Sequence, residues 1–378
     1  MDKHLHIICL DIPYPADYGG VYDLFYKLPA LQNEGVKIHL HCFHKQGTAQ
    51  DELKKYCVEV FYYERNLGSS SLFSKFPYIV ASRRNEELIE RLLQDEYPVF
   101  MEGVHCTYIT NDKRFTKRKM FVRIHNVENK YYNRLSKTSD SIKDKLYYLF
   151  EAYQLKNYEK KLAKQATAYW AVSKPDTDYY KYDLDCETMD YLPLFIPEWK
   201  VSGQAGMGSY CLYHGNLGIE ENDYAVTWLI KNVFNHIDVP LVVSGKNPSK
   251  KLTALVEKNK LACVVAVPSD SEMQDIINKA HIHVLPSFNN TGVKIKLLNA
   301  LFNGRHCLAN DAMISGTSLR SLCHIANTPD EFIERILLLY HQPFTENEKR
   351  SREKILQQEF SNEANAKQIV KWIWTEYA

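Results

Sequence analysis

The sequence predicts an α/β protein made of two doubly wound parallel sheets, and three observations lead to this fold class. Short, continuously apolar runs alternate with helical stretches along the whole chain, as in sheets that helices cover on both faces. The alternation pauses once, in a segment rich in proline and glycine between residues 192 and 208. The length of 378 residues suits two average domains. A single closed barrel of eight strand–helix units is less favoured, because the pause interrupts the count.

The first half of the chain carries the elements of one such sheet. Strands are expected from apolar runs and helices from longer amphipathic stretches. The expected strands are residues 4–10, 36–43, 98–101, 120–124 and 168–172, and the expected helices are residues 21–33, 85–93 and 141–166.

After the pause the same alternation restarts. The expected strands are residues 210–214, 240–244, 264–267, 282–286 and 306–309, and the expected helices are residues 223–234, 249–258, 271–280 and 294–302. A helical tail, residues 347–377, ends in an aromatic segment that contains Trp372, Ile373 and Trp374. Leaving these side chains in water would be unfavourable, so the tail is expected to dock on the protein.

Composition and charge exclude several classes of protein. The 47 basic and 46 acidic side chains give a formal net charge of +1, which provides no global attraction to nucleic acid. The nine cysteines are odd in number and form no C-x-x-C pair, so neither a disulfide framework nor a zinc knuckle is indicated. The first residues do not form a secretion signal, and no apolar run approaches the ~20 residues of a membrane span. A cytoplasmic location is expected.

One helical segment leaves the membrane question open. Residues 145–161 mix tyrosines with lysines, a pattern that could touch an anionic membrane or a lipid-linked substrate. Acidic residues dilute the positive charge, so a plain amphipathic core helix is the favoured interpretation. Peripheral contact with the inner face of a membrane remains the alternative.

Ligands of open parallel sheets bind beyond the carboxyl ends of the strands, which directs attention to the loops there. Gly19 and Gly20 follow the first strand, and a helix is expected to begin directly after them. Two glycines allow a ligand to approach the backbone closely, although a simple turn would also use them. They do not form a dinucleotide-binding fingerprint.

Two further loops of the first half end in polar side chains. The strand at residues 120–124 runs into His125, Asn126 and Glu128, and the strand at residues 98–101 runs into Glu102 and His105. A buried histidine is usually a satisfied core group. Two of them at strand ends of one sheet nevertheless favour a functional role.

In the second half, two strand ends carry glycine at the bend. Gly215 is followed by Asn216, and Gly245 is followed by Lys246. Lys246 would lie at the rim of a site as a phosphate contact, and a solvated surface lysine is the alternative.

The loop after residue 286 is the most informative. It is small and polar, enters a helix at Gly292, and places Lys294 and Lys296 in the first turns. Lysines are unfavourable at the positive end of a helix dipole, so an anion such as a diphosphate is expected there. Thr291 and Asn299 are eight residues apart, about two helical turns, and would face the same side. No Walker lysine motif is present.

Three H-x-H pairs occur, at residues 4 and 6, 39 and 41, and 281 and 283. Alternate strand residues share a face, so each pair could hold a metal ion. No acidic or cysteine partner has a suitable spacing, and no metal site is predicted.

Taken together, these residues resemble a GT-B glycosyltransferase, with the retaining family 4, also called group 1, as the most similar branch. The resemblance rests on the two nucleotide-binding-type domains, the glycine pair at 19–20 and the segments 125–128, 214–216, 243–245 and 292–301. It implies two Rossmann-like domains that face a central cleft, with a C-terminal helix that crosses back to the first. Residues 1–195 with 361–378 would bind the acceptor, and residues 196–360 would bind the donor.

The loops and the resemblance together assign roles to individual residues. The expected catalytic residues are His105, His125 and Lys294. The expected donor-binding residues are Gly215, Asn216, Gly245, Lys246, Thr291, Gly292, Val293, Lys296 and Asn299, and the expected acceptor-binding residues are Gly19, Gly20, Asn126 and Glu128. Members of the family usually carry a pair of glutamates at the positions matching Thr291 and Asn299, so both carboxylates are absent here.

The resemblance implies transfer of a hexose from a nucleotide-diphosphate sugar, the co-substrate, to a glycan or lipid-linked acceptor. Retention of configuration, no metal, no further cofactor and a role in cell-surface polysaccharide biosynthesis are expected with it. A nucleotide-sugar epimerase of similar fold and a decayed sugar-nucleotide or glycan-binding module are the alternatives. A hydrolase would need two carboxylates in one site, and only Glu102 and Glu128 offer them.

Overall fold

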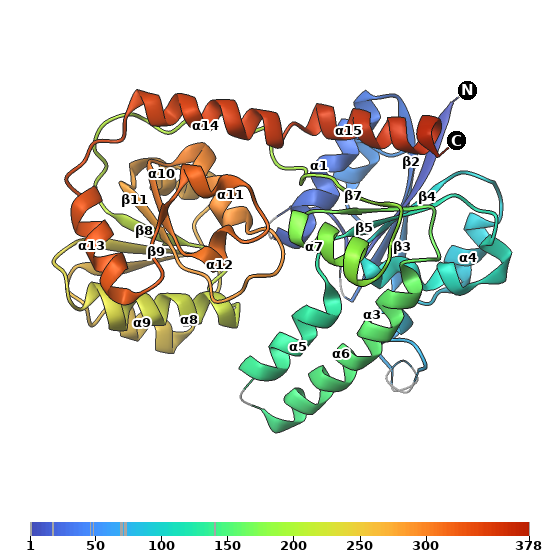
Figure 1. Cartoon of the computed structure of the whole chain (residues 1–378), viewed down its shortest axis with the longest axis horizontal. Helices are drawn as coiled ribbons and strands as arrows, with labels where there is room; N and C mark the ends of the chain where they lie inside the picture. Colours follow the sequence, from blue (N-terminus) through green and yellow to red (C-terminus); the bar gives the residue numbers. More distant parts are fainter. Residues whose placement is uncertain are drawn as a thin grey trace. The chain divides into compact units, whose positions relative to one another are not determined.

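The computed structural model describes residues 2–16, 19–45, 47, 49–68, 71, 74–139 and 141–377. It divides into two compact units, Met1–Pro197 with Phe360–Ala378, and Glu198–Glu359 (Figure 1). Each unit is an α/β domain around one parallel sheet, which confirms the predicted fold class. Among the described residues, no helix is both long and apolar enough to cross a membrane.

The first sheet has seven strands in the order β3-β2-β1-β4-β5-β6-β7. The strand order reverses between β1 and β4, which is the switch point where ligands of doubly wound sheets bind. Side chains alternate between two buried faces: Phe100 and Phe121 pack on one, and Met101 and Val122 on the other. The strands are β1 (Lys3–Cys9), β2 (Val36–His44), β3 (Glu59–Glu64), β4 (Val99–Glu102), β5 (Met120–Ile124), β6 (Ala168–Ala171) and β7 (Met189–Tyr191).

Helices cover both faces of this sheet, and the C-terminal segment of the chain is one of them. Trp372 stacks on Trp170 with 4.9 Å between ring centroids, and Ile373 is buried, so the tail docks on the protein as predicted. The main α-helices are α1 (Gly19–Asn33), α4 (Glu86–Leu92), α5 (Glu128–Thr138), α6 (Ile142–Leu162) and α15 (Asn362–Lys371). The other helical segments are η1 (Asp51–Lys55), α3 (Tyr78–Ala81), η2 (Val104–Asn111), η3 (Lys113–Phe115), α7 (Lys174–Asp178), η4 (Tyr179–Asp183) and η7 (Trp372–Glu376).

The second sheet has six strands in the order β10-β9-β8-β11-β12-β13, with its switch point between β8 and β11. Its strands are β8 (Cys211–His214), β9 (Leu241–Gly245), β10 (Ala262–Ala266), β11 (Ile282–Leu285), β12 (His306–Ala309) and β13 (His324–Ile325). Its helices are α8 (Glu220–Leu229), η5 (Ile230–Phe234), α9 (Lys250–Val256), α10 (Asp270–Lys279), α11 (Ile295–Asn303), α12 (Asp311–Ile314), η6 (Leu319–Leu322), α13 (Pro329–Leu339) and α14 (Glu346–Glu359).

Two helix starts differ from the sequence-based expectation. Helix α1 begins at Gly19, so the glycine pair forms its first two residues and does not precede it. Helix α11 begins at Ile295, not at Gly292. Gly292 has a φ of +62°, in the left-handed region that cannot continue a right-handed helix, and glycine adopts it without strain. Thr291, Gly292 and Val293 therefore belong to the loop before the helix.

Candidate functional site

The switch point of the first sheet holds a histidine–carboxylate pair. Glu102 is the last residue of β4, and His125 follows the neighbouring strand β5. His125 Nε2 lies 2.9 Å from Glu102 Oε2. Because an ionised carboxylate only accepts, Nε2 carries the proton, and Nδ1 of a neutral ring remains an acceptor. The His125 side chain is 15% exposed and Glu102 is fully buried, so the imidazole can still meet a ligand.

Glu102 belongs to a buried network of charged side chains from helix α1 and strands β4 and β5. Lys27 of α1 donates to Glu102 and to Asp23, the latter at 3.0 Å. Arg123 of β5 donates to both oxygens of Asp23, at 3.0 and 2.9 Å, and to the carbonyl of Leu192 at 2.7 Å. Burial would raise the pKa of Glu102, but Lys27 and His125 hold it below its ordinary value. Two cations thus balance two carboxylates inside the domain.

His105, the other histidine predicted at a strand end of this sheet, lies beside His125. A Cβ atom on Gly103 would approach His105 Nδ1 to 3.0 Å and His125 Cδ2 to 3.7 Å, so the two rings flank this glycine. Gly103 has a φ of +80°, which glycine adopts without strain. Burial, followed by the charge of Arg83, lowers the pKa of His105 well below its ordinary value. His105 is therefore neutral near pH 7.

The predicted acceptor-binding residues occupy different environments. Asn126 lies partly exposed in the turn between β5 and α5. Glu128, the first residue of α5, is 3% exposed, and burial and the nearby Glu159 raise its pKa to about 8. Glu128 is therefore a buried, protonated acid near neutral pH, which the polar sequence around it did not indicate. Gly19 and Gly20 lie in the first turn of α1.

The switch point of the second sheet holds a small pocket of about 40 Å³, which is lined by Tyr213 of β8 and by Pro286 and Ser287, the residues that follow β11. Lys296 Nζ donates to Tyr213 Oη at 2.8 Å and to Asn222 Oδ1, and it lies 4.7 Å from the centre of the Tyr213 ring. Burial and the repulsion of Lys294 lower the pKa of Lys296 to about 8, against the attraction of Glu221. The pocket is lined by Tyr213, Glu221, Asn222, Pro286, Ser287, Lys294 and Lys296.

The loop that enters α11 is held by its own polar groups. Thr291 donates its N–H and its hydroxyl to Asn289 Oδ1, at 2.9 and 2.8 Å. Lys294 Nζ donates to the carbonyls of Thr291 and Gly292, at 2.9 and 3.1 Å. Lys294, the residue before α11, makes no side-chain capping hydrogen bond, although its carbonyl accepts the N–H of Leu297 at 3.0 Å. The other N–H groups of the first turn are suited to an anion, as expected at the start of a helix.

The prediction that Thr291 and Asn299 share one helix face is wrong. Thr291 precedes the helix, so the spacing of two helical turns does not apply. Asn299 lies within α11, where its Oδ1 accepts from Asn303 Nδ2 at 2.8 Å. Val293 lies in the same loop as Thr291, partly exposed.

The two glycine bends of the second domain touch each other. A Cβ atom on Gly245 would lie 1.7 Å from the carbonyl oxygen of Gly215, so only glycine fits at residue 245. Asn216 accepts the N–H of Gly218 with its side chain and the Asn222 amide with its carbonyl. Lys246 is partly exposed, and its carbonyl accepts the N–H of Leu217 at 2.8 Å.

Sequence reasoning missed Tyr213, Glu221, Asn222 and Ser287 in this pocket. Glu221 accepts from Ser287 Oγ at 3.4 Å and from Asn289 Nδ2 at 3.3 Å, and so links α8 to the loop after β11. Each of these residues is polar and next to a strand end or a helix start. Their position was the only sign of a binding role in the sequence, but many polar residues share it, and the strand order is needed to select those at the switch point.

The comparisons with known proteins agree with this geometry. Residues 208–342 match the family described as "Glycosyl transferases group 1". A 44.6 kDa protein in the cps region of Klebsiella pneumoniae is 26% identical over 329 residues, which cover 82% of this chain and 84% of that protein. Over residues 208–342, most of its second domain, the chain is therefore similar to the group 1 glycosyltransferases.

Solved structures show that the chain has the GT-B fold. Sucrose-phosphate synthase from Thermosynechococcus elongatus superposes with a TM-score of 0.70 at 13% identity, covering 98% of both chains. WaaG, a glycosyltransferase of lipopolysaccharide biosynthesis, superposes with a TM-score of 0.67 at 12% identity, covering 98% of this chain and 100% of the other. A glycosyltransferase from Rickettsia africae gives 0.66 at 15% identity over 99% and 100%.

Two of the six H-x-H histidines, His6 and His39, do have acidic partners, which the search by sequence spacing did not find. His6 Nε2 lies 3.0 Å from Asp95, and His39 Nδ1 lies 2.7 Å from Glu59. These carboxylates are 89 and 20 residues away in the sequence, so no local spacing reveals them. Across β1 and β2 the histidines pair with each other, His4 with His39 and His6 with His41, each at 2.9 Å.

Proposed function

We propose that this chain is a group 1 glycosyltransferase that moves a hexose, with retention, from a nucleoside-diphosphate sugar to a glycan or lipid-linked acceptor in the assembly of a cell-surface polysaccharide. The observation that carries the proposal is the Lys296 pocket, which lies at the β8/β11 switch point beside the uncapped start of α11. Anabaena HepE, which has the same fold, has been solved in complex with UDP-glucose, and the Klebsiella relative is encoded in a cps region. Both are consistent with this donor and this pathway.

The donor is held through its diphosphate. Breaking the bond between the anomeric carbon and the phosphate oxygen leaves the electron pair on the diphosphate, whose negative charge grows in the transition state. Lys296, Lys294 and the first N–H groups of α11 are the groups that stabilise this charge. In the proposal these donors replace a metal ion at the diphosphate.

The acceptor side uses the first domain. The acceptor oxygen forms the new bond to the anomeric carbon, and its proton passes to an oxygen of the departing diphosphate, so atoms and charge balance. His125, oriented by Glu102, offers Nδ1 to a hydroxyl of the sugar or the acceptor. Neutral His105 lies beside it and binds without adding charge.

Incubation of the purified chain with UDP-, GDP- and ADP-hexoses tests the proposal and separates its alternatives. A transferase releases the nucleoside diphosphate slowly to water even without an acceptor, and the freed sugar keeps its anomeric configuration by NMR. An epimerase changes the sugar while the nucleotide stays attached. Binding without either product would show a decayed module, and inverted configuration would contradict retention.

A second part of the proposal concerns the membrane, and it rests on helix α6. The exposed apolar side chains of α6 recur at helical spacing and so form one stripe, while Glu151, Leu155 and Glu159 on another side are buried. The favoured expectation of a plain core helix therefore describes only the inner face. The stripe consists of Ile142 (76% exposed), Leu146 (64%), Leu149 (49%), Phe150 (53%) and Tyr153 (68%).

Lysines border this stripe. At 100° per residue, Lys143 falls on one flank and Lys145 and Lys156 fall on the other, whereas the exposed Asp144 falls on the side away from the stripe. An apolar stripe between cationic flanks is the pattern of a helix that lies in the interface of an anionic membrane. We propose that α6 rests on such a surface and brings the first domain to a lipid-linked acceptor.

Sedimentation with vesicles tests this contact. The chain should bind vesicles that contain phosphatidylglycerol, lose binding at high salt, and bind phosphatidylcholine vesicles weakly. The double variant Leu146→Glu with Phe150→Glu should abolish binding, whereas Leu338→Glu, at an exposed leucine of the second domain, should not. Equal binding by the double variant would contradict the assignment to α6.

A further inference from the structure

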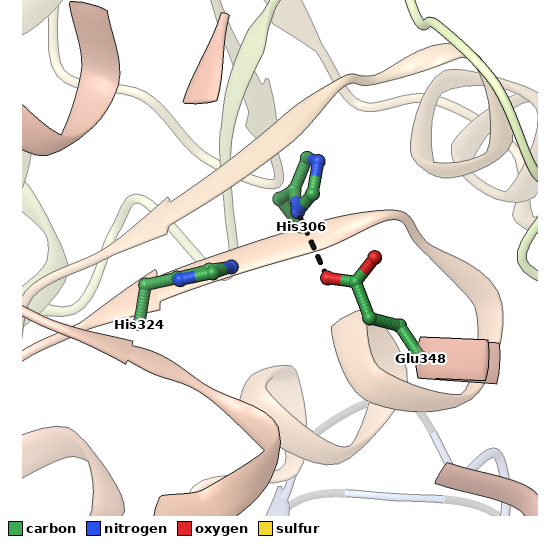
Figure 2. Close-up of side chains that lie close together, drawn as sticks. All are labelled: His306, His324 and Glu348. Atoms are coloured by element: carbon green, nitrogen blue, oxygen red, sulfur yellow. Dashed lines mark ion pairs between the residues drawn. The ribbon is translucent and has the colours of Figure 1, made fainter. Parts of the chain in front are cut away.

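A group of metal-binding side chains lies in the second domain, away from the donor pocket. His306 is the first residue of β12, His324 is the first residue of β13, and Glu348 lies in the first turn of α14 (Figure 2). One ligand atom from each lies within 4.8 Å of the others. These residues come from three elements, and none of them belongs to an H-x-H pair.

The hydrogen bonds of His306 leave one ring nitrogen unsatisfied. Nε2 lies 3.0 Å from the carbonyl oxygen of Gln342. Since a carbonyl only accepts, Nε2 carries the proton, and Nδ1 of the neutral ring is an acceptor with a free lone pair. His306 is 2% exposed, and Nδ1 is buried without a hydrogen-bond partner. A buried acceptor in this state is unfavourable unless a proton or a cation meets it.

Hydrogen bonds to Thr345 orient the carboxylate of Glu348. Its Oε2 accepts the N–H of Thr345 at 2.8 Å and the Thr345 hydroxyl at 2.7 Å, and these hydrogen bonds cap the N-terminus of α14. Its Oε1 is thereby turned toward His306 Nδ1 at 3.6 Å, the contact drawn in Figure 2. Since Nδ1 and Oε1 are both acceptors, they cannot hydrogen-bond to each other, and 3.6 Å also exceeds hydrogen-bond distance.

The spacing suits two ligands of one metal ion. Ligands bound at about 2.0–2.1 Å in tetrahedral geometry lie about 3.3 Å apart. Ligating histidines usually donate their other nitrogen to a carbonyl or a carboxylate, as Nε2 of His306 does to Gln342. His324 and Glu348 are partly exposed, so solvent can supply a fourth ligand.

Other groups near the cluster are engaged elsewhere. Arg352 donates to the carbonyls of Gly304 and Arg305, at 2.8 and 2.5 Å. His281, whose ring centroid lies 5.1 Å from that of His306, accepts the N–H of Gly208 and faces the carbonyl of Leu339. The other metal-type group among the described residues, Asp23, Glu102 and His125, already contains the ammonium of Lys27, so a cation is not needed there.

We propose that His306 Nδ1, His324 and Glu348 bind a structural transition-metal ion, with Zn²⁺ as the expected ion. Two imidazole nitrogens and one carboxylate match zinc, whereas Mg²⁺ and Ca²⁺ prefer oxygen ligands alone. His306 begins β12, whereas His324 lies beside Leu308 on the edge strand β13, so the site lies at the β12/β13 edge of the sheet, and none of its residues lines the donor pocket. The ion ties α14 to strands β12 and β13 and takes no part in sugar transfer.

Glu348→Gln is the most informative variant. A glutamine can still accept from Thr345, and its amide can donate a hydrogen bond to His306 Nδ1. The variant therefore satisfies the orphaned nitrogen without a metal and removes the anionic ligand. His324→Ala removes a second ligand, and His236→Ala at an exposed histidine of the same domain is the matched control.

The test measures metal content and stability of the full chain. After dialysis against metal-free buffer and reloading with ZnCl₂, the wild type and His236→Ala should retain about one zinc per chain, since folded zinc sites bind tightly. Glu348→Gln and His324→Ala should lose at least tenfold in zinc affinity. Zinc should raise the Tm of the wild type only, and Co²⁺ should give a tetrahedral visible spectrum.

Two results would overturn the proposal. If the wild type retains no zinc and shows no cobalt spectrum, His306 and Glu348 form an imidazolium–carboxylate pair that shares a proton. If zinc is retained equally by Glu348→Gln and His324→Ala, the ion binds elsewhere. Neither readout depends on the proposed transfer reaction.

Discussion

At the switch point of the first sheet, Asp23 and Glu102 face Lys27 and Arg123, and all four are buried. At the corresponding point of the second sheet, Lys294 and Lys296 line a pocket with a single carboxylate, Glu221. The first site is neutral without a ligand, whereas the second retains a positive charge and an uncapped helix start. This difference in charge is the reason why we propose hydroxyl groups as ligands of the first site and a diphosphate as the ligand of the second.

The largest expected effect breaks the balance of the first site. Arg123→Met leaves Asp23 buried with one cation fewer, and the free energy of unfolding should fall by about 3–5 kcal/mol in chemical denaturation. Arg114→Met, which removes an exposed pair with Asp112, should cost less than about 1 kcal/mol. Adding Asp23→Asn to Arg123→Met should restore part of the loss. Equal effects of Arg123→Met and Arg114→Met would contradict the buried network.

The next effect concerns the charge of the second site. Lys296→Met removes the cation that faces the diphosphate, and donor turnover should fall by about 10²–10³-fold, the loss expected for one transition-state donor. Lys231→Met, at an exposed lysine of η5, provides the control in the same assay. A loss of turnover below about threefold would mean that the pocket does not hold the leaving group, because losing a charge-assisted hydrogen bond should reduce turnover by more than that.

A smaller effect tests the buried acid of the first domain. The pKa of Glu128 is raised to about 8, so between pH 4.5 and 8 the unfolded chain releases a proton that the folded chain keeps. Stability from this group is present below pH 4.5 and falls as the pH rises toward 8. Glu128→Gln should therefore raise the free energy of unfolding at pH 7 by about 1–3 kcal/mol, and by little at pH 4.

Urea titrations at both pH values measure the effect, with Glu90→Gln at an exposed site as the control. A loss of stability at pH 7 would show instead that the charged carboxylate is used. That result would favour the predicted acceptor-binding role of Glu128 over a structural one.

The smallest effect is a pH dependence of donor binding. The pKa of Lys296 is lowered to about 8 from 10.5, so the folded protein releases this proton before the unfolded chain does, and stability from this group rises between pH 8 and 10.5. A bound diphosphate favours the charged form and takes up the proton. Nucleotide affinity should thus fall by up to about tenfold per pH unit above pH 8. Calorimetry with Lys296→Met should show no such slope.

Much of the fold could be predicted because central strands are continuously apolar. Strands such as β5 and β12 match their expected ranges. The short or edge strands β3, β7 and β13 were missed: β3 is half-exposed and carries glutamates at both ends, and β13 has two residues. Helix α5 was missed because its surface is strongly polar.

The site was predictable only in part. Strand-end histidines and the lysine loop drew attention to His125 and Lys296, and both lie at switch points. The contacts made by two buried lysines were not visible, since Lys27 is 75 residues from Glu102 and Lys296 is 74 residues from Asn222. The start of α11 was placed too early because the sequence does not reveal that Gly292 adopts a positive φ.

Thermal unfolding with nucleotides tests the central claim most directly. A ligand that binds only the folded chain raises Tm, and the increase grows with the ratio of ligand concentration to Kd. The account predicts that one of UDP, GDP and ADP raises the Tm of the wild type and of Lys231→Met, and leaves Lys296→Met unchanged. A shift of the same size in Lys296→Met, or no shift with any of the three in the wild type, would contradict a diphosphate site in the second domain.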